Sequence, residues 1–143
     1  DSICNRAHKK GVKILVDAEE SWIQNAIDEI VLKMMIKYNK KETVVFNTAQ
    51  MYRHDRLIYL NKLKELAEKE NFFIGIKLVR GAYIEKENKR AIERNYKSPI
   101  CASKNLSDIN YNDGVSFIIS NLRIFSLFSG THNEESIYKI NWE

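Results

Sequence analysis

The sequence has little proline, glycine and cysteine: one proline, five glycines and two cysteines among 143 residues. With 44% hydrophobic and 29% charged residues, it lacks the composition of a disordered or low-complexity segment. It also lacks a long apolar run, because Lys33 interrupts the stretch 30–36, and nothing here is long enough to span a bilayer. Neither end has the charged-then-apolar pattern of a targeting segment. The sequence therefore predicts an ordinary globular domain.

Two further shortages exclude classes of site. Cys4 and Cys101 form no CxxC pair, so we expect two reduced thiols, as in a cytosol or an organelle matrix. His8, His54 and His132 have no metal-ligand spacing, and we expect no metal site. The net charge of +4 comes from Lys and Arg that alternate with Glu instead of clustering, so we expect no nucleic-acid partner.

What the sequence does contain is a periodicity that changes from strand-like to helix-like four times. The predicted strands are residues 13–16, 43–48, 72–79 and 124–128, and the predicted helices are 21–35, 55–70, 84–95, 111–122 and 134–140. Ser21 and Gln24 have the spacing of a capping box at the start of the first of these helices. The stretch 96–110, which contains Pro99, breaks the rhythm and is predicted to be a loop.

This alternation predicts an α/β fold with a parallel sheet and right-handed crossovers. A barrel and an open doubly wound sheet both fit, and both bind ligands at the carboxyl ends of the strands. No GxGxxG turn follows the first strand, which weakens the dinucleotide-binding alternative. Four units are half of a (β/α)8 barrel, which takes about 250 residues. We therefore expect an incomplete barrel with two open edges and an inner face exposed to water.

Polar residues stand at the carboxyl end of every predicted strand. They are Asp17, Gln50, Lys77 with Arg80, and Thr131 with His132 and Asn133. If the four strands are neighbours, these side chains converge on one rim. Asp17 is well placed to face a ligand, whereas Glu19 and Glu20 equally fit acidic residues at a helix start. Gln50 and His132 also have plain structural alternatives, as a satisfied loop amide and a strand-end histidine.

The basic residues of the third strand are the most unusual feature. Lys77 interrupts a strand otherwise suited to burial, and a buried ammonium needs an anionic or strongly polar partner. The alternative is an edge-strand lysine that reaches solvent. In Arg80-Gly81-Ala82, a guanidinium beside two minimal side chains would let a phosphate approach backbone amides and a fixed cation together, although such turns are also common without a ligand.

At these same positions the chain resembles the proline dehydrogenase family. Four motifs occur in the order of the family and cover nearly the whole chain: LVDAEE at 15–20, NTAQMY at 47–52, KLVRGAY at 77–83 and GTHN at 130–133. The resemblance implies a distorted (β/α)8 barrel that binds FAD non-covalently at its carboxyl-terminal rim. It implies oxidation of L-proline to Δ1-pyrroline-5-carboxylate by hydride transfer to the flavin, in proline catabolism.

The resemblance also implies roles for individual residues. Asp17 would be the active-site aspartate, Lys77 the basic group near the reactive flavin nitrogen, and Tyr83 part of the substrate side of the pocket. The FAD contacts that it implies are Ala18, Gln50, Val79, Arg80, Gly81, Ala82, Thr131 and His132. Some relatives carry Arg at the position of Lys77 and Lys at that of Arg80, an exchange that keeps the net charge but changes bidentate geometry.

Two parts of the family pattern have no counterpart here: a late helix with paired arginines and a glutamate that hold proline, and an early-strand lysine. We therefore expect residues 1–143 to be the central part of the catalytic barrel, truncated at both ends and inactive alone. The alternatives are an inactive remnant or assembly subunit, and a half-barrel binding module for a phosphorylated ligand. For the full-length enzyme the resemblance implies a quinone or another electron acceptor, peripheral membrane association, and a location in the bacterial cytoplasm or the mitochondrion.

Overall fold

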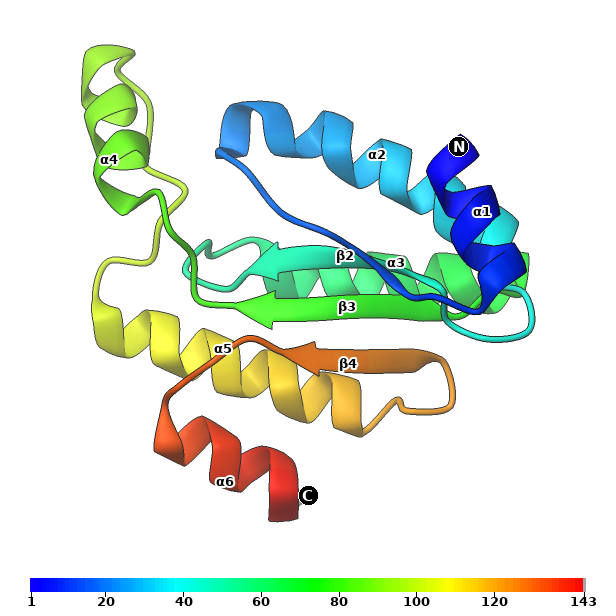
Figure 1. The fold of residues 1–143 in the computed structure, drawn as a ribbon. Coiled ribbons are helices and arrows are strands. Elements are labelled where there is room, and N and C mark those ends of the chain that lie inside the picture. The colour runs from blue at the N-terminus through cyan, green and yellow to red at the C-terminus, as the bar shows by residue number, and fades with distance from the viewer. Residues whose placement is uncertain (143) are drawn as a thin grey trace.

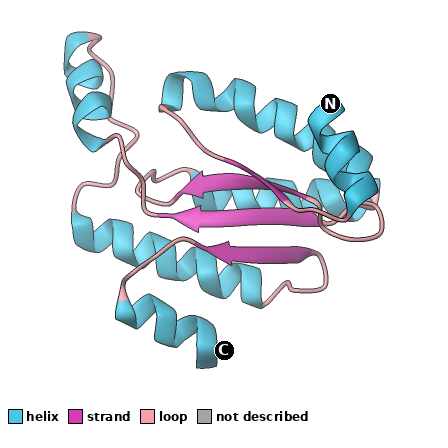
Figure 2. Cartoon of the chain, viewed as in Figure 1, coloured by secondary structure: helices cyan, strands magenta, loops and turns pink. Residues whose placement is uncertain are grey.

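A computed structural model describes residues 1–142, in which four strands alternate with helices (Figure 2). In chain order the elements are α1 (Ser2–Lys10), β1 (Ile14–Val16), α2 (Ser21–Tyr38), β2 (Val45–Gln50), α3 (Arg56–Glu70), β3 (Ile74–Val79), α4 (Ile84–Glu93), α5 (Lys104–Ile119), β4 (Phe125–Ser129) and α6 (Glu134–Trp142). The predicted alternation of strand and helix is confirmed.

The strands form one parallel sheet in the order β1-β2-β3-β4, which is also their order along the chain. All three pairings are in register over short runs, with Ile14 beside Val45, Phe46 beside Gly75, and Gly75 beside Ser126. Because neighbouring strands are consecutive in sequence, each crossover helix returns the chain to the next position of a parallel sheet. The carboxyl ends of all four strands therefore lie at one edge, as the sequence predicted.

The two faces of the sheet differ. Ile74, Ile76 and Leu78 of β3 are fully buried and belong to a core that includes side chains of α2, α3 and α5. Figure 1 shows these three helices flanking the sheet, while α4 stands apart beyond the carboxyl ends of β2 and β3. The alternate residues of the strands face the other way, and among them Phe128 remains 49% exposed. Within the described residues β1 and β4 each pair with one strand, so each has an open edge.

Two predictions about local structure are wrong, and one helix was not predicted. Helix α1 is a short and mostly polar helix, and only Cys4 and Ala7 of its residues are buried. Helix α5 begins at Lys104 instead of residue 111, where Ser103 caps it by accepting a hydrogen bond from the backbone N–H of Leu106. The first half of this helix is mostly polar, so the sequence there shows no apolar spacing typical of a helix.

The capping box predicted at the start of α2 is also different. The N-cap residue is Glu20, and the hydroxyl of Ser21 is committed to Glu87 instead of the helix. Gln24 does reach back, but its Oε1 accepts from the backbone N–H of Glu19 at 2.8 Å. The spacing of Ser21 and Gln24 is therefore compatible with a capping box, but the Ser21 hydroxyl binds Glu87 of the distant helix α4 instead.

A cluster of charges at the start of α3 gives the stability of the fold a pH dependence. Burial opposes ionisation of Asp55, but hydrogen bonds from Arg56 and Arg53 outweigh it and lower the pKa of Asp55 to about 2. Because the folded-state pKa is depressed from its ordinary 3.8, the stabilisation is present above about pH 4 and is lost as the pH falls towards about 2.

We expect the free energy of unfolding of Asp55→Asn to decrease less steeply than that of the unmodified protein as the pH falls from about 4 to about 2. Chemical unfolding at several pH values measures it, with Glu68→Gln as a control that removes an exposed ion pair with Lys64 on the same helix. An unchanged slope in Asp55→Asn would contradict the assignment.

Candidate functional site

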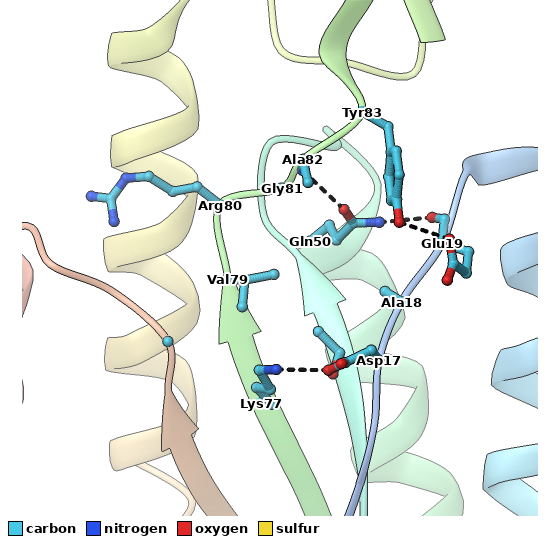
Figure 3. A pocket seen from close by; sticks show the side chains of 12 residues that line it. Asp17, Ala18, Glu19, Gln50, Lys77, Val79, Arg80, Gly81, Ala82 and Tyr83 are labelled. Atoms are coloured by element: carbon cyan, nitrogen blue, oxygen red, sulfur yellow. Dashed lines mark hydrogen bonds and ion pairs between the residues drawn. The ribbon is translucent and has the colours of Figure 1, made fainter. Parts of the chain in front are cut away.

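A pocket of ≈ 470 Å³ opens at the carboxyl edge of the sheet (Figure 3). Its lining consists of Asp17, Ala18, Glu19, Thr48, Gln50, Lys77, Val79, Arg80, Gly81, Ala82, Tyr83 and Gly130. These residues come from the ends of β2 and β3 and from the segments that follow β1, β3 and β4. Its volume is in the range of small-molecule sites, and its position is where parallel α/β sheets bind ligands.

An ion pair between Lys77 and Asp17 lies on the floor of this pocket. The Lys77 Nζ donates to Asp17 Oδ1 at 2.7 Å, across the sheet from β3 to the segment after β1 (Figure 3). Strand β3 lies between β2 and β4, so the alternative of an edge-strand lysine is wrong. The Lys77 side chain is 23% exposed and that of Asp17 is 73% exposed, and both line the pocket. An ammonium has three N–H donors, and Asp17 takes one of them.

A second set of hydrogen bonds joins the two loops that wall the pocket. The Tyr83 hydroxyl donates to Glu19 Oε2 at 2.7 Å, and Gln50 Nε2 donates to the Glu19 carbonyl at 2.8 Å. Gln50 Oε1 accepts from the backbone N–H of Ala82 at 3.3 Å. The hydrogen bond to Glu19 raises the pKa of Tyr83 above its ordinary 10.0. Gln50 thus bridges the segments after β1 and β3.

The wall after β3 depends on Gly81. Its φ of 134° is a conformation that side chains rarely adopt, and a Cβ at this position would lie 2.5 Å from Tyr52 Cδ1. The backbone therefore packs directly on the buried ring of Tyr52 as it turns from β3 toward Tyr83.

We expect Gly81→Ala to lower the free energy of unfolding by about 1–3 kcal/mol, because it adds a steric clash to an unfavourable φ. Gly11→Ala is the matched control, since Gly11 has φ +63° and no atom within 4 Å of its added Cβ. Chemical unfolding should show the larger loss in Gly81→Ala. A loss no greater than that of Gly11→Ala would contradict the packing of Gly81 on Tyr52.

The Arg80 guanidinium lies against α5 and α6. It hydrogen-bonds Asp108, Thr131 Oγ1 at 2.7 Å and Ser136 Oγ at 3.1 Å, and it lies 4.5 Å from the ring centroid of Tyr111. Figure 3 shows this side chain pointing away from the floor of the pocket. Lys104 and then Arg80 lower the pKa of Asp108, which stays ionised. In this structure Arg80 connects the end of β3 to α5 and α6.

The pocket brings together most of the residues that the sequence singled out. Those that line it are Asp17, Ala18, Gln50, Lys77, Val79, Arg80, Gly81, Ala82 and Tyr83. Thr131 and His132 lie outside the lining: Thr131 accepts from Arg80, and His132 is exposed. Glu19, for which a helix-start role was an equal alternative, and Thr48, which was not predicted, line the pocket too. Thr48 pairs in register with Lys77. In the sequence it stands two positions before Gln50 in the same strand, and this spacing, which puts both side chains on one face, was the signal for it.

Within residues 1–142 no group of three or more His, Cys, Asp or Glu side chains is arranged to hold a metal ion. No helix in the same range combines the length and the apolar character needed to cross a membrane.

Comparison with known proteins places this geometry in context. A family model described as proline dehydrogenase matches residues 1–141. The chain is 40% identical over 131 residues to the carbapenem antibiotics biosynthesis protein CarD of Pectobacterium carotovorum subsp. carotovorum, covering 92% of this chain and 34% of CarD. It is 35% identical over 143 residues to mitochondrial proline dehydrogenase 1 of Dictyostelium discoideum, covering 96% of this chain and 25% of that protein. It is 32% identical over 140 residues to mitochondrial proline dehydrogenase 1 of Homo sapiens, covering 96% of this chain and 23% of that protein. The chain thus spans about a quarter to a third of the length of these relatives.

Solved structures show the same fold. Proline utilization A from Bdellovibrio bacteriovorus superposes with a TM-score of 0.91 at 21% identity, over 98% of this chain and 15% of that one. The corresponding protein of Bradyrhizobium japonicum gives 0.89 at 22% identity, over 98% and 15%. The predicted fold, consecutive β/α units of a (β/α)8 barrel, is confirmed.

Proposed function

The chain belongs to the proline dehydrogenase family, and from this membership we propose that it forms the central, FAD-binding part of an enzyme that oxidises L-proline to Δ1-pyrroline-5-carboxylate. The observation that carries the proposal is the Lys77–Asp17 ion pair on the floor of the pocket. The two partners come from separate family motifs, and the fold brings them to 2.7 Å at the edge where such sheets bind ligands.

The residues of the pocket fit a flavin. Lys77 presents a cation with unused donors, Val79 and Ala82 present small apolar surfaces, and Gly81 adds no side chain to the lining. A planar cofactor that gains negative charge on reduction suits such a site, because fixed positive charge stabilises developing negative charge. When bound, the flavin supplies the acceptor for the hydride that leaves the proline ring carbon next to nitrogen.

The chain's own residues would hold this arrangement in place. Asp17 fixes the Lys77 ammonium by a charge-assisted hydrogen bond, so that the cation is oriented before substrate arrives. Tyr83, held by its hydrogen bond to Glu19, forms the wall on the substrate side. Gln50 holds the two walls together through Glu19 and Ala82.

We propose that residues 1–143 do not turn over proline alone. The family groups that grip the substrate, the paired arginines with their glutamate and the early lysine, have no counterpart in this sequence. The open edges of β1 and β4 and the exposed Phe128 on the inner face fit a barrel completed by further strands. A binding module for phosphorylated ligands is less well supported, because the chain belongs to the proline dehydrogenase family over residues 1–141.

The proposed partners of the full-length protein that carries this chain are L-proline and a quinone or another electron acceptor, with peripheral association to a membrane. Mitochondrial relatives favour a mitochondrial location for a eukaryotic source, and a bacterial source would place the protein in the cytoplasm. Proline catabolism is the proposed process. The 40% identity to CarD favours carbapenem antibiotic biosynthesis as a second one.

The test is the visible spectrum of the purified full-length protein after incubation with FAD and gel filtration. We expect a retained flavin band, and denaturation should release FAD. In a proline:dye oxidoreductase assay the full-length protein should turn over and the 143-residue chain should not. Absence of bound flavin from a folded full-length protein would contradict the proposal, and proline-dependent turnover by residues 1–143 alone would contradict the claim that the chain is incomplete.

A further inference from the structure

Glu87 of α4 is a charged side chain with no solvent exposure. Its carboxylate accepts two hydrogen bonds from one residue: the backbone N–H of Ser21 at 2.6 Å on Oε1 and the Ser21 hydroxyl at 2.7 Å on Oε2. Among residues 1–142 no ion pair balances this carboxylate. Burial of a carboxylate without a counter-charge is costly, and the two hydrogen bonds from Ser21 offset part of that cost, so separation of Ser21 from Glu87 is unfavourable.

The contact belongs to a wider seam between α4 and the segment after β1. Residues on one face of α4, together with Tyr83 just before the helix, contact four consecutive residues, 19–22. The pairs are Tyr83–Glu19, Lys86–Glu20, Glu87–Ser21 and Arg90–Trp22. The spacing of 83, 86, 87 and 90 is that of a single helical face. Helix α4 stands apart from the sheet in Figure 1, and this largely polar seam is what holds it to the segment 19–22.

The seam lies directly beside the groups proposed to do the chemistry. The segment 17–21 begins with Asp17, the partner of Lys77, and ends at Ser21. The segment that leads into α4 contains Gly81 and Tyr83, which line the opposite wall of the pocket. Since the outer pairs of the seam are partly exposed and Glu87 is fully buried, the Glu87–Ser21 bonds are its best protected part.

We propose that Glu87 is a positioning residue that fixes the segment 17–21, and with it Asp17, against the wall formed by residues 81–83. This rests on the proposed function, because it assigns Glu87 to the site of that reaction. Glu87 acts through Ser21 and does not line the pocket. Losing it frees the segment that carries Asp17, and misplacement of a catalytic group by about 1 Å costs about 100-fold in rate.

Three variants of the full-length protein test this. Glu87→Ala removes both bonds. Glu87→Gln keeps the shape, because its oxygen can accept from the Ser21 N–H while its amide donates to the hydroxyl. Glu93→Ala is the matched control, as it removes an exposed glutamate of the same helix that lies 3.9 Å from Lys89.

Two readouts are measured: hydrogen–deuterium exchange of residues 17–24, and kcat and KM for proline. For Glu87→Ala we expect exchange at 17–24 to be faster by about 10-fold or more, the equivalent of a lost charged hydrogen bond. We expect kcat/KM to fall by about 10- to 100-fold with unchanged exchange in the sheet. Glu87→Gln should recover most of both losses, and Glu93→Ala should behave as the unmodified protein.

Three results would overturn the proposal: unchanged exchange at 17–24 in Glu87→Ala, faster exchange throughout the sheet, which would make Glu87 a general stabilising residue, or an equal effect of Glu93→Ala. If the unmodified protein binds no flavin, the proposed function fails. The exchange measurement still decides whether Glu87 holds the segment 17–21.

Discussion

Asp17→Ala in the full-length protein should lower kcat for proline oxidation by about 100-fold or more, with little change in stability or flavin content. The Asp17 side chain is 73% exposed, so its removal costs the fold little. Its effect is local: it holds the Lys77 ammonium at 2.7 Å, and without it the cation is free to turn within the pocket. Steady-state kinetics with proline and the thermal unfolding midpoint measure the two effects separately.

Glu20→Ala is the comparison variant for this prediction, because it removes a carboxylate that holds α4 to the same segment instead of the carboxylate that holds Lys77. Glu20 is an acidic residue of the same segment, but its carboxylate binds Lys86 at 3.0 Å outside the pocket lining. If Asp17→Ala turned over proline at the unmodified rate, Asp17 would be only an acidic residue near a helix start. Equal losses in both variants would show that the segment as a whole matters and the carboxylate of Asp17 does not.

Lys77→Met should leave flavin bound but lower its reduction potential. A positive charge in a pocket partly open to solvent favours an added negative charge by on the order of 1–4 kcal/mol. For a two-electron couple this corresponds to about 20–90 mV. Methionine keeps the length and apolar stem of lysine, so the change isolates the charge. Redox titration of the purified variant measures the shift, and flavin content after gel filtration measures retention.

Arg80→Met is the companion variant, because Arg80 lies three positions along from Lys77, at the end of β3. The resemblance makes Arg80 an FAD contact, and a guanidinium beside Gly81 suits a phosphate, so we assign Arg80 to the FAD pyrophosphate. By that assignment the variant should weaken FAD retention by about 1.5–3 kcal/mol. The structure adds a second cause, since the variant also releases Asp108, Thr131 and Ser136 from the guanidinium. If Lys77→Met sheds flavin while Arg80→Met shifts the potential, the two roles are reversed. If neither variant changes anything, both residues are structural.

The sequence predicted the strands, their parallel order and the edge at which polar groups gather. It could do so because these features depend on local apolar runs and on the short-range rules that connect consecutive β/α units. The sequence also predicted that Lys77 has an anionic or strongly polar partner, because an ammonium within an apolar strand needs such a partner.

Other parts of the site depend on contacts between distant segments and left no local signal. Ser21 looked like a helix cap and instead binds Glu87, which is 66 residues away. Arg80 looked like a phosphate ligand, and only the packing of α5 and α6 beside β3 shows that Asp108 and Ser136 occupy its guanidinium. The early start of α5 was hidden for another reason: its first turns are polar on most sides, so no apolar period marks them.

The central claim is that this chain carries the flavin site of an enzyme that oxidises proline. The most direct test is an anaerobic titration of the flavin-loaded full-length protein with L-proline, followed by the visible absorption of the flavin. The proposed function predicts a saturable loss of the oxidised flavin band, much weaker in Asp17→Ala, and release of Δ1-pyrroline-5-carboxylate. A protein whose bound flavin is bleached by dithionite but stays oxidised at every proline concentration would contradict it.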